Sequence, residues 1–296
     1  MTRIVAKLSL LASAALLLFA GTALANEKCA SCHKDIAANH ATTLHGKAGK
    51  DCLSCHGGGD AHMANPSKTN IIRFGKGADV KAQDAQCQQC HAKNQKLMFW
   101  DNSAHKRDDI ACSSCHTVHK APKPYAKQPD KCFECHKNVK SEANKFSHHP
   151  IIEGKVSCSD CHNPHGTLTK HMVKADSVNL LCYSCHADKR GPYINQHPPV
   201  EEDCMICHAP HGTKAYKLTR EKMPSLCNNC HAGTHAPKRV SNVGYGDGFW
   251  TGNNTFTGGT PSGRIFSQSC INCHTNIHGS NAPTGTSGRH GQRFER

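Results

Sequence analysis

The chain has 296 residues, among them 20 cysteines and 24 histidines, and its formal net charge is +14 at neutral pH. After position 25, only 36 of the remaining 271 residues (296 − 25) are Leu, Ile, Val or Phe, about 13 %. A chain so poor in core-forming side chains cannot offset its conformational entropy by burying its own apolar surface. The composition therefore excludes an ordinary globular domain, and we expect a bound apolar component to supply the core.

The N-terminus has the pattern of a secretory signal peptide. Arg3 and Lys7 give a positive start, residues 8–24 are apolar, and Ala23-Leu24-Ala25 offers a small-x-small cleavage site. We predict a signal peptide over 1–25. A membrane anchor is the alternative, but the apolar run is rather short for a bilayer span. Export argues against nucleic acid as the partner of this basic chain.

The sequence Cys-x-x-Cys-His recurs ten times and uses all 20 cysteines. The cysteine pairs are Cys29 and Cys32, Cys52 and Cys55, Cys87 and Cys90, Cys112 and Cys115, Cys132 and Cys135, Cys158 and Cys161, Cys182 and Cys185, Cys204 and Cys207, Cys227 and Cys230, and Cys270 and Cys273. The histidines that end the motifs are His33, His56, His91, His116, His136, His162, His186, His208, His231 and His274. Two thiols at this spacing can bond a porphyrin edge, and the adjacent imidazole can ligate its iron. The motifs therefore predict ten covalently bound haem c groups.

Zinc knuckles are the alternative reading of paired cysteines. A histidine follows every second cysteine, however, and exported free cysteine pairs tend to oxidise. Haem also explains the composition, because it is a large apolar disc, and it explains the charge. Without the signal peptide the net charge is 34 − 22 = +12, and each haem contributes about −1 through its propionates.

Fourteen histidines lie outside the motifs. Taking consecutive motifs in pairs divides the chain into five repeats, which begin at Cys29, Cys87, Cys132, Cys182 and Cys227. Each repeat has one histidine before its second motif and one after it. We predict these as the distal iron ligands: His45, His62, His105, His119, His149, His165, His197, His211, His235 and His278. Ten such ligands indicate complete bis-histidine ligation.

Some of these assignments have alternatives. His40 competes with His45, and His148 competes with His149, although the His149-Pro150 step matches His197-Pro198. The remaining histidines are predicted to lie at the surface or to contact propionates: His40, His148, His171 and His290. A methionine could replace a distal histidine: Met63, Met98, Met172, Met205 or Met223. The sequence does not say whether a distal histidine serves its own repeat or a neighbouring one.

The repeats start at intervals of 58, 45, 50 and 45 residues, which is typical of an array whose units pack on their neighbours. We predict a multihaem cytochrome c fold, an elongated rod of ten closely spaced haems. It should be mostly coil with short α-helices, such as 84–92 and 178–187, and almost no β structure. The stretches 57–86 and 236–269 are predicted to be irregular loops over haem edges, or alternatively docking surfaces. The tail 279–296 is predicted to be mobile.

The motif number and order, and the ending Cys270-Ile-Asn-Cys273-His274-Thr-Asn-Ile-His278-Gly279, resemble the MtrA/DmsE-type periplasmic decahaem cytochromes, which include PioA and MtoA. In that family two pentahaem halves form a rod that sits inside an outer-membrane β-barrel porin. The resemblance implies halves at 26–145 and 146–296. It also implies a periplasmic protein held at the outer membrane by a porin, with periplasmic or inner-membrane cytochromes and a cell-surface multihaem cytochrome as further partners.

We expect an electron carrier rather than an enzyme. About 27 residues per haem (271/10) leave little protein to separate the haems, and full axial ligation leaves no iron open to a substrate. The chain should relay electrons between periplasmic carriers and the cell surface, in metal reduction or Fe(II) oxidation. The alternatives are a multihaem oxidoreductase with an open haem site and a soluble periplasmic electron reservoir. The sequence does not mark the direction of electron flow.

Overall fold

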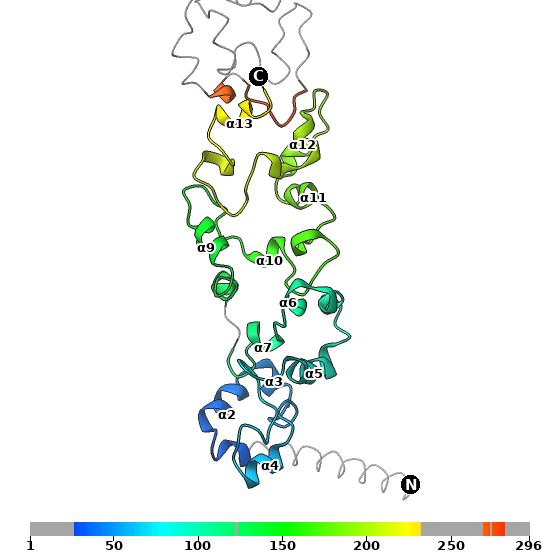
Figure 1. Ribbon diagram of the computed structural model, residues 1–296, viewed down its shortest axis with the longest axis vertical. Coiled ribbons are helices and arrows are strands. Elements are labelled where there is room, and N and C mark those ends of the chain that lie inside the picture. Colours follow the sequence, from blue (N-terminus) through cyan, green and yellow to red (C-terminus); the bar gives the residue numbers. More distant parts are fainter. Residues whose placement is uncertain (1–26, 122–123, 232–268, 273, 282–296) are drawn as a thin grey trace, which may run out of the picture. The chain divides into compact units, whose positions relative to one another are not determined.

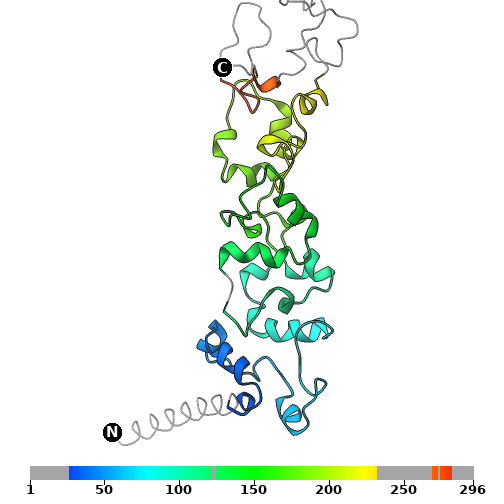
Figure 2. The same cartoon turned by 90° about the vertical axis from the view of Figure 1, so that its left-hand side faces the viewer.

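The computed structural model describes residues 27–121, 124–231, 269–272 and 274–281. The predicted signal peptide, nearly all of the 236–269 insertion and the tail from 282 onward lie outside the described residues. Short helices joined by loops make up the described chain, as Figures 1 and 2 show from two directions.

The α-helices are α2 (Lys34–Ala41), α3 (Leu44–Lys47), α4 (Gly59–Ala64), α5 (Val80–His91), α6 (Ala104–Arg107), α7 (Cys112–Cys115), α8 (Gln128–Cys132), α9 (Lys137–Ala143), α10 (Cys158–Cys161), α11 (Val178–Tyr183), α12 (Pro198–Glu202) and α13 (Ser225–Asn228). The 3-10 helices are η1 (Gln95–Leu97), η2 (Trp100–Asn102), η3 (Tyr125–Lys127), η4 (Lys170–Met172), η5 (Ala187–Lys189), η6 (Cys204–Ile206), η7 (Tyr216–Leu218) and η9 (Cys270–Asn272). Extended pairing in these ranges is limited to isolated bridges, such as His162 with Val173 and His208 with Thr219. The prediction of a mostly coil chain with short helices and almost no β structure is confirmed. None of the helices in these ranges has the length and apolar character that crossing a bilayer requires.

Two predicted helix boundaries were wrong. The helix expected at 84–92 begins at Val80, because the Asp79 side chain accepts a hydrogen bond from the Ala82 N–H (2.6 Å) and caps an earlier turn. The helix expected at 178–187 ends at Tyr183, and a separate turn, η5, begins at Ala187. The motif interrupts it because the backbone turns out of the helix at His186, where φ is −104° and ψ is 50°.

The chain forms two compact units. One consists of Met1–Lys127 and Asn163–Leu168, and the other of Gln128–His162 and Thr169–Arg296. The first unit therefore holds four motifs and the second holds six. The division of the haems into two groups of five, at 26–145 and 146–296, remains a prediction.

The polypeptide buries few large apolar side chains. Its main apolar cluster consists of Phe133, Ala143 and Ile151, with Val139 and Val156 packed against them. Large apolar side chains are instead exposed at many positions: Leu168 (87 %), Ile194 (81 %), Phe146 (77 %), Leu44 (74 %) and Tyr216 (70 %). This distribution fits a chain whose core is completed by bound apolar groups.

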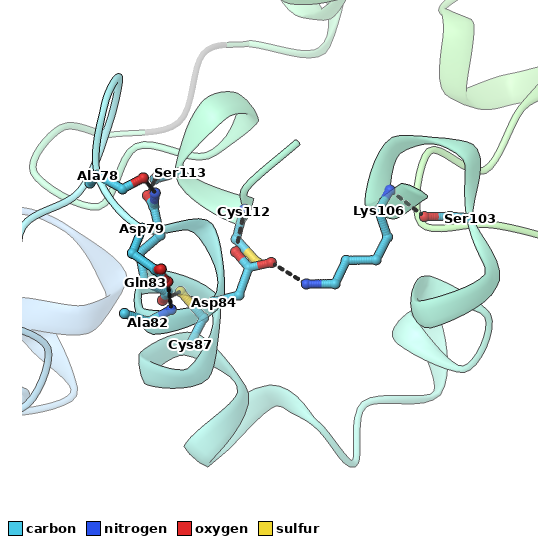
Figure 3. Close-up of polar contacts among 10 residues, drawn as sticks. All are labelled: Ala78, Asp79, Ala82, Gln83, Asp84, Cys87, Ser103, Lys106, Cys112 and Ser113. Atoms are coloured by element: carbon cyan, nitrogen blue, oxygen red, sulfur yellow. Dashed lines mark hydrogen bonds and ion pairs between the residues drawn. The ribbon is translucent and has the colours of Figure 1, made fainter. Parts of the chain in front are cut away.

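Buried polar side chains tie together the two motifs of a repeat. Asp84, three residues before Cys87, accepts a hydrogen bond from the Cys112 N–H at 2.9 Å (Figure 3). Asn179, three residues before Cys182, accepts one from the Cys204 N–H at 2.8 Å.

The third repeat has a related contact, in which Gln128 accepts from the Ser159 N–H at 3.1 Å and from the Ser157 hydroxyl. In each of these three repeats, a side chain that lies before the first motif therefore holds the start of the second motif.

Candidate haem-binding sites

The Cys-x-x-Cys-His motifs form single helical turns. The backbone N–H of the motif histidine donates to the carbonyl of the first cysteine, as His56 does to Cys52 at 2.9 Å and His208 does to Cys204 at 3.0 Å. Side chains at positions i, i+3 and i+4 of a helical turn project from one face. Both thiols and the imidazole of a motif therefore face the same way, which is the local geometry that haem attachment requires.

The first cysteines of the two motifs within a repeat lie close together. Burial and, next in size, the neighbouring Cys204 together raise the pKa of the Cys182 thiol to about 12. The same two causes raise the pKa of Cys227 to about 12 beside Cys270.

The remaining repeats show the same proximity. Burial and the neighbouring Cys29 raise the pKa of Cys52 to about 11. The neighbouring thiol is the largest cause of the raised pKa at two more of the cysteines: Cys87 acts on Cys112, and Cys158 acts on Cys132. The two motifs of each repeat therefore present their attachment points side by side.

At two junctions within the second compact unit, the second cysteines of consecutive repeats lie close together. Burial raises the pKa of Cys161, and Cys185 of the following repeat raises it further. Burial likewise raises the pKa of Cys207, and Cys230 of the following repeat raises it further. Motifs joined through their first cysteines and motifs joined through their second cysteines are in both cases consecutive in the sequence.

Eight motif histidines face a second histidine at a nearly constant separation. The distances between ring centroids are 6.3 Å for His33 and His62, 5.9 Å for His56 and His119, 6.0 Å for His91 and His45, 5.9 Å for His116 and His165, 6.1 Å for His162 and His211, 6.3 Å for His186 and His149, 6.1 Å for His208 and His278, and 6.1 Å for His231 and His197. Two metal–imidazole bonds of about 2 Å, plus about 1 Å from each nitrogen to its ring centre, predict a separation of about 6 Å. The gap between the rings therefore fits a single iron.

One pair differs from the others in the orientation of its rings. The planes of His45 and His91 are 82° apart, close to perpendicular. In the other seven pairs the interplanar angle lies between 10° and 47°.

The ring pairs join neighbouring repeats. A histidine upstream of the second motif faces the first motif of the next repeat, as His149 faces His186. A histidine downstream of the second motif faces the second motif of the preceding repeat, as His211 faces His162. His33 and His62 are the exception, because both belong to the first repeat.

Hydrogen bonds at Nδ1 orient many of these rings. Among the motif histidines, Nδ1 donates to a backbone carbonyl at His56 (Ile72, 2.8 Å), His162 (His171, 2.9 Å) and His208 (Lys217, 3.1 Å). Four predicted distal ligands make the same kind of bond, from Nδ1 to the backbone carbonyl of the residue in parentheses: His62 (Ser67, 2.9 Å), His105 (Pro164, 2.9 Å), His149 (Pro210, 2.7 Å) and His197 (Ile277, 3.0 Å). A proton held on Nδ1 leaves Nε2 as the nitrogen that can bind a metal.

Burial keeps several of the rings in the neutral form that binds metals. It lowers the pKa of His278 to about 4, with smaller effects from Lys189 and His208. Burial is also the main cause of a lowered pKa at His45, His119, His162, His165, His197 and His208.

The environments of His148 and His149 are different. His148 donates from Nδ1 to the Lys145 carbonyl at 2.6 Å, and its Nε2 lies 3.0 Å from the Glu153 carboxylate. Both nitrogens of His148 are therefore occupied by protein groups, whereas His149 faces the motif histidine His186. This geometry favours His149 as a ligand.

His40 and His45 also differ. The rings of His40 and His119 meet edge to face, with 6.4 Å between their centroids. His119, however, is stacked on the motif histidine His56. His45 faces the motif histidine His91 directly. Three predicted or unassigned positions, Cys273, His235 and His290, lie outside the described residues.

Asp84 and Asn179 were missed by the sequence analysis. A sequence signal for them exists, since a polar side chain stands three residues before the first cysteine in three of the five repeats, at Asn26, Asp84 and Asn179. His171, predicted as a surface residue, also has a structural contact: its backbone carbonyl accepts from His162.

Two families match parts of this chain. The doubled CXXCH motif matches residues 148–191 and 197–236, and the NrfB-like cytochrome c-type proteins match residues 52–131. The chain is also 39 % identical over 245 residues to the multihaem cytochrome MtrA of Shewanella baltica. The aligned region covers 80 % of this chain and 70 % of MtrA. The chain belongs to the MtrA family of multihaem cytochromes.

Two further relatives share shorter regions. NrfB, a cytochrome c-type protein of Escherichia coli, is 27 % identical over 129 residues, which is 39 % of this chain and 68 % of NrfB. The multihaem cytochrome MtrC of Shewanella baltica is 30 % identical over 120 residues, 38 % of this chain and 18 % of MtrC. As a member of the MtrA family, this chain carries covalently bound haem c and transfers electrons, and it is not an enzyme.

Proposed function

We propose that this MtrA-family cytochrome binds ten haems with two histidines each and relays electrons between periplasmic carriers and the cell surface. The observation that carries the proposal is the series of eight histidine pairs, separated by 5.9–6.3 Å between ring centroids. They include eight of the ten motif histidines and eight of the ten predicted distal ligands. His105 and His235 complete the proposed set of ten.

The order of the motifs supports a continuous relay. Within a repeat the first cysteines lie side by side, as Cys182 and Cys204 do, and between repeats the second cysteines approach, as Cys161 and Cys185 do. Thioether bonds at these thiols would bring the edges of successive porphyrins close together. Because electron tunnelling weakens steeply with distance, short steps between successive groups suit a relay.

The protein residues have distinct parts in this function. Bound haem supplies reversible one-electron chemistry at iron. The cysteines would hold each haem covalently, and the two imidazoles of each pair would both ligate its iron, which would leave no position open to a substrate. The carbonyl groups that accept from Nδ1, such as Pro210 for His149, fix the orientation of the imidazole planes.

The proposed location is the periplasm, at the outer membrane, with a β-barrel porin as the partner that holds the cytochrome. The family to which the chain belongs and its N-terminal export pattern support this proposal. Periplasmic or inner-membrane cytochromes would exchange electrons at one end of the relay, and a cell-surface multihaem cytochrome at the other. Metal reduction and Fe(II) oxidation are the two processes that such a conduit serves.

Two measurements test the proposal. The intact mass of the mature protein should exceed that of the polypeptide by ten haems, and the oxidised protein should show low-spin haem that does not respond to cyanide. A smaller haem count, or a high-spin signal that cyanide shifts, would contradict complete bis-histidine ligation.

The partner is tested by affinity capture of the native protein from solubilised outer membranes. A β-barrel porin should be recovered in a fixed ratio to the cytochrome. Recovery of a monomer from the soluble periplasm alone would instead indicate an electron reservoir.

A further inference from the structure

We propose that Asp84 is a potential-setting residue, whose buried carboxylate lowers the midpoint potential of the haem at the third motif, attached through Cys87 and Cys90. The inference rests on the proposed attachment of haem at this motif. It adds a residue that neither bonds the haem nor ligates its iron.

Asp84 lies three residues before the second repeat, buried where the two motifs of that repeat meet. It is 1 % exposed, and its carboxylate has two partners on separate segments: the Cys112 N–H at 2.9 Å and the Lys106 ammonium at 3.0 Å. Figure 3 shows the carboxylate between these two groups, on the same helix as Cys87. Asp84 is therefore fixed next to the attachment points of two successive haems.

The ion pair with Lys106 offsets the charge of Asp84 only in part. The Lys106 side chain is 24 % exposed, whereas that of Asp84 is 2 % exposed. Water screens the more exposed charge more effectively, so a negative potential remains on the buried side. Oxidised haem carries one more positive charge than reduced haem, and a nearby negative charge therefore favours the oxidised form and lowers the midpoint potential.

The negative charge of Asp84 acts on the first cysteines of both motifs, Cys87 and Cys112. At Cys112, the hydrogen bond with Cys87 and burial raise the pKa of the thiol, and Asp84 raises it further. At Cys87, the hydrogen bond with Cys112 lowers the pKa to about 7, while burial and Asp84 act in the opposite direction.

The fourth repeat shows that the position needs an acceptor rather than a charge. Asn179 occupies the same place and accepts from the Cys204 N–H at 2.8 Å, while its amide donates to the Val200 and Glu201 carbonyls at 2.9 Å. Asp203 also places a carboxylate next to Cys204. Asp203 is partly exposed, however, and its carboxylate accepts a hydrogen bond from the Met205 N–H. Replacing Asp by Asn at position 84 should therefore remove the charge and keep the hydrogen bond.

The experiment is a redox titration of the full-length protein and of Asp84→Asn, followed by electron paramagnetic resonance. The haem at the third motif can be singled out, because the rings of His45 and His91 are near-perpendicular and such ligands give a low-spin signal unlike that of near-parallel rings. At the potential where this haem is half reduced in the wild type, the variant should have at least three times the wild-type ratio of reduced to oxidised haem. Asp101→Asn, which removes an exposed charge from the same repeat, should leave the ratio unchanged.

A reciprocal variant guards against a structural effect. Lys106→Gln removes the cation that partly offsets Asp84 and keeps a side-chain donor for its carboxylate, so it should lower the ratio of reduced to oxidised haem at the third motif. An Asp84→Asn titration that coincides with the wild type, or shifts the opposite way, overturns the inference. If Asp84→Asn does not retain its haems, an unchanged Lys106→Gln titration overturns it. Absence of haem from the wild-type motif, seen in the intact mass, would instead refute the proposed function.

Discussion

His45 and His91 face each other at 6.0 Å between ring centroids, with their planes 82° apart. Perpendicular imidazole planes leave the two iron d orbitals of π symmetry nearly equal in energy, whereas parallel planes split them. We therefore expect a strongly anisotropic low-spin signal from this haem, beside rhombic signals from the other seven histidine pairs that the structure describes. His45→Met should abolish the anisotropic signal and raise the midpoint potential of that haem, because methionine ligation favours the reduced state. His40→Gln should leave the signal unchanged, and the reverse result would make His40 the ligand.

The choice between His149 and His148 predicts a difference in ligand binding. His149→Ala should leave one iron five-coordinate, so that the variant binds about one cyanide or carbon monoxide per protein and gains a high-spin absorption. His148→Gln removes a ring whose two nitrogens already have protein partners, and it should stay low-spin throughout. Ligand binding by the second variant and not the first would reverse the assignment.

A glycine next to a predicted ligand has little room for a side chain. Gly166 follows His165, its φ is +102°, and an added Cβ would lie 2.4 Å from the Phe99 carbonyl oxygen. Gly166→Ala should lower stability by about 1–3 kcal/mol through strain at this backbone conformation, and more through the steric clash. Gly49→Ala is the matched control, because φ there is +69° and no atom lies within 4 Å of the added Cβ. Thermal melts should show a larger loss for Gly166→Ala, and equal losses would refute the clash.

The pair of His148 and Glu153 predicts a pH dependence of stability. The hydrogen bond with Glu153, and then the Lys145 carbonyl, raise the pKa of His148 above its ordinary value of 6.5. A raised pKa means that the stabilisation is complete below about pH 6.5 and is lost as the pH rises through the raised value. The difference in melting temperature between the wild type and His148→Gln should therefore be larger at about pH 6 than at about pH 9. A difference independent of pH would show that the pair does not contribute through charge.

Removal of the haems should unfold the chain. The described polypeptide has a small apolar cluster around Phe133, and it leaves side chains such as Leu168 exposed. Protein produced without haem attachment, with its thiols kept reduced, should give the far-ultraviolet circular dichroism of an unordered chain and show no cooperative melt. A cooperative melt of the haem-free chain would mean that the polypeptide has a sufficient core of its own.

The sequence was enough to predict the haem chemistry and the sparse secondary structure. Cysteine spacing is a covalent requirement of haem attachment, so it does not depend on the tertiary fold. The distal candidates followed from counting, and eight of them lie opposite motif histidines in the structure. The preference for His149 over His148 came from the neighbouring proline and agrees with the geometry.

The partners of the distal histidines could not be predicted. His149 precedes Cys158 by nine residues yet faces His186 of the next repeat, because the intervening loop carries it across. Nearness in sequence therefore gives the wrong partner for the histidines that join repeats. The contacts of Asp84 and Asn179 with the second motif were not predicted either, because they join segments more than twenty residues apart.

The crossing of histidines between repeats has a consequence for the order of maturation. Under the proposed export from the N-terminus, His45 would cross the membrane before His91, so the first motif of the second repeat would find its second ligand already present. The second motif of the first repeat, with His56, has to wait until His119 emerges 63 residues later (119 − 56). Alternate sites along the nascent chain would thus stay exposed to small ligands and oxidants until the following repeat arrives.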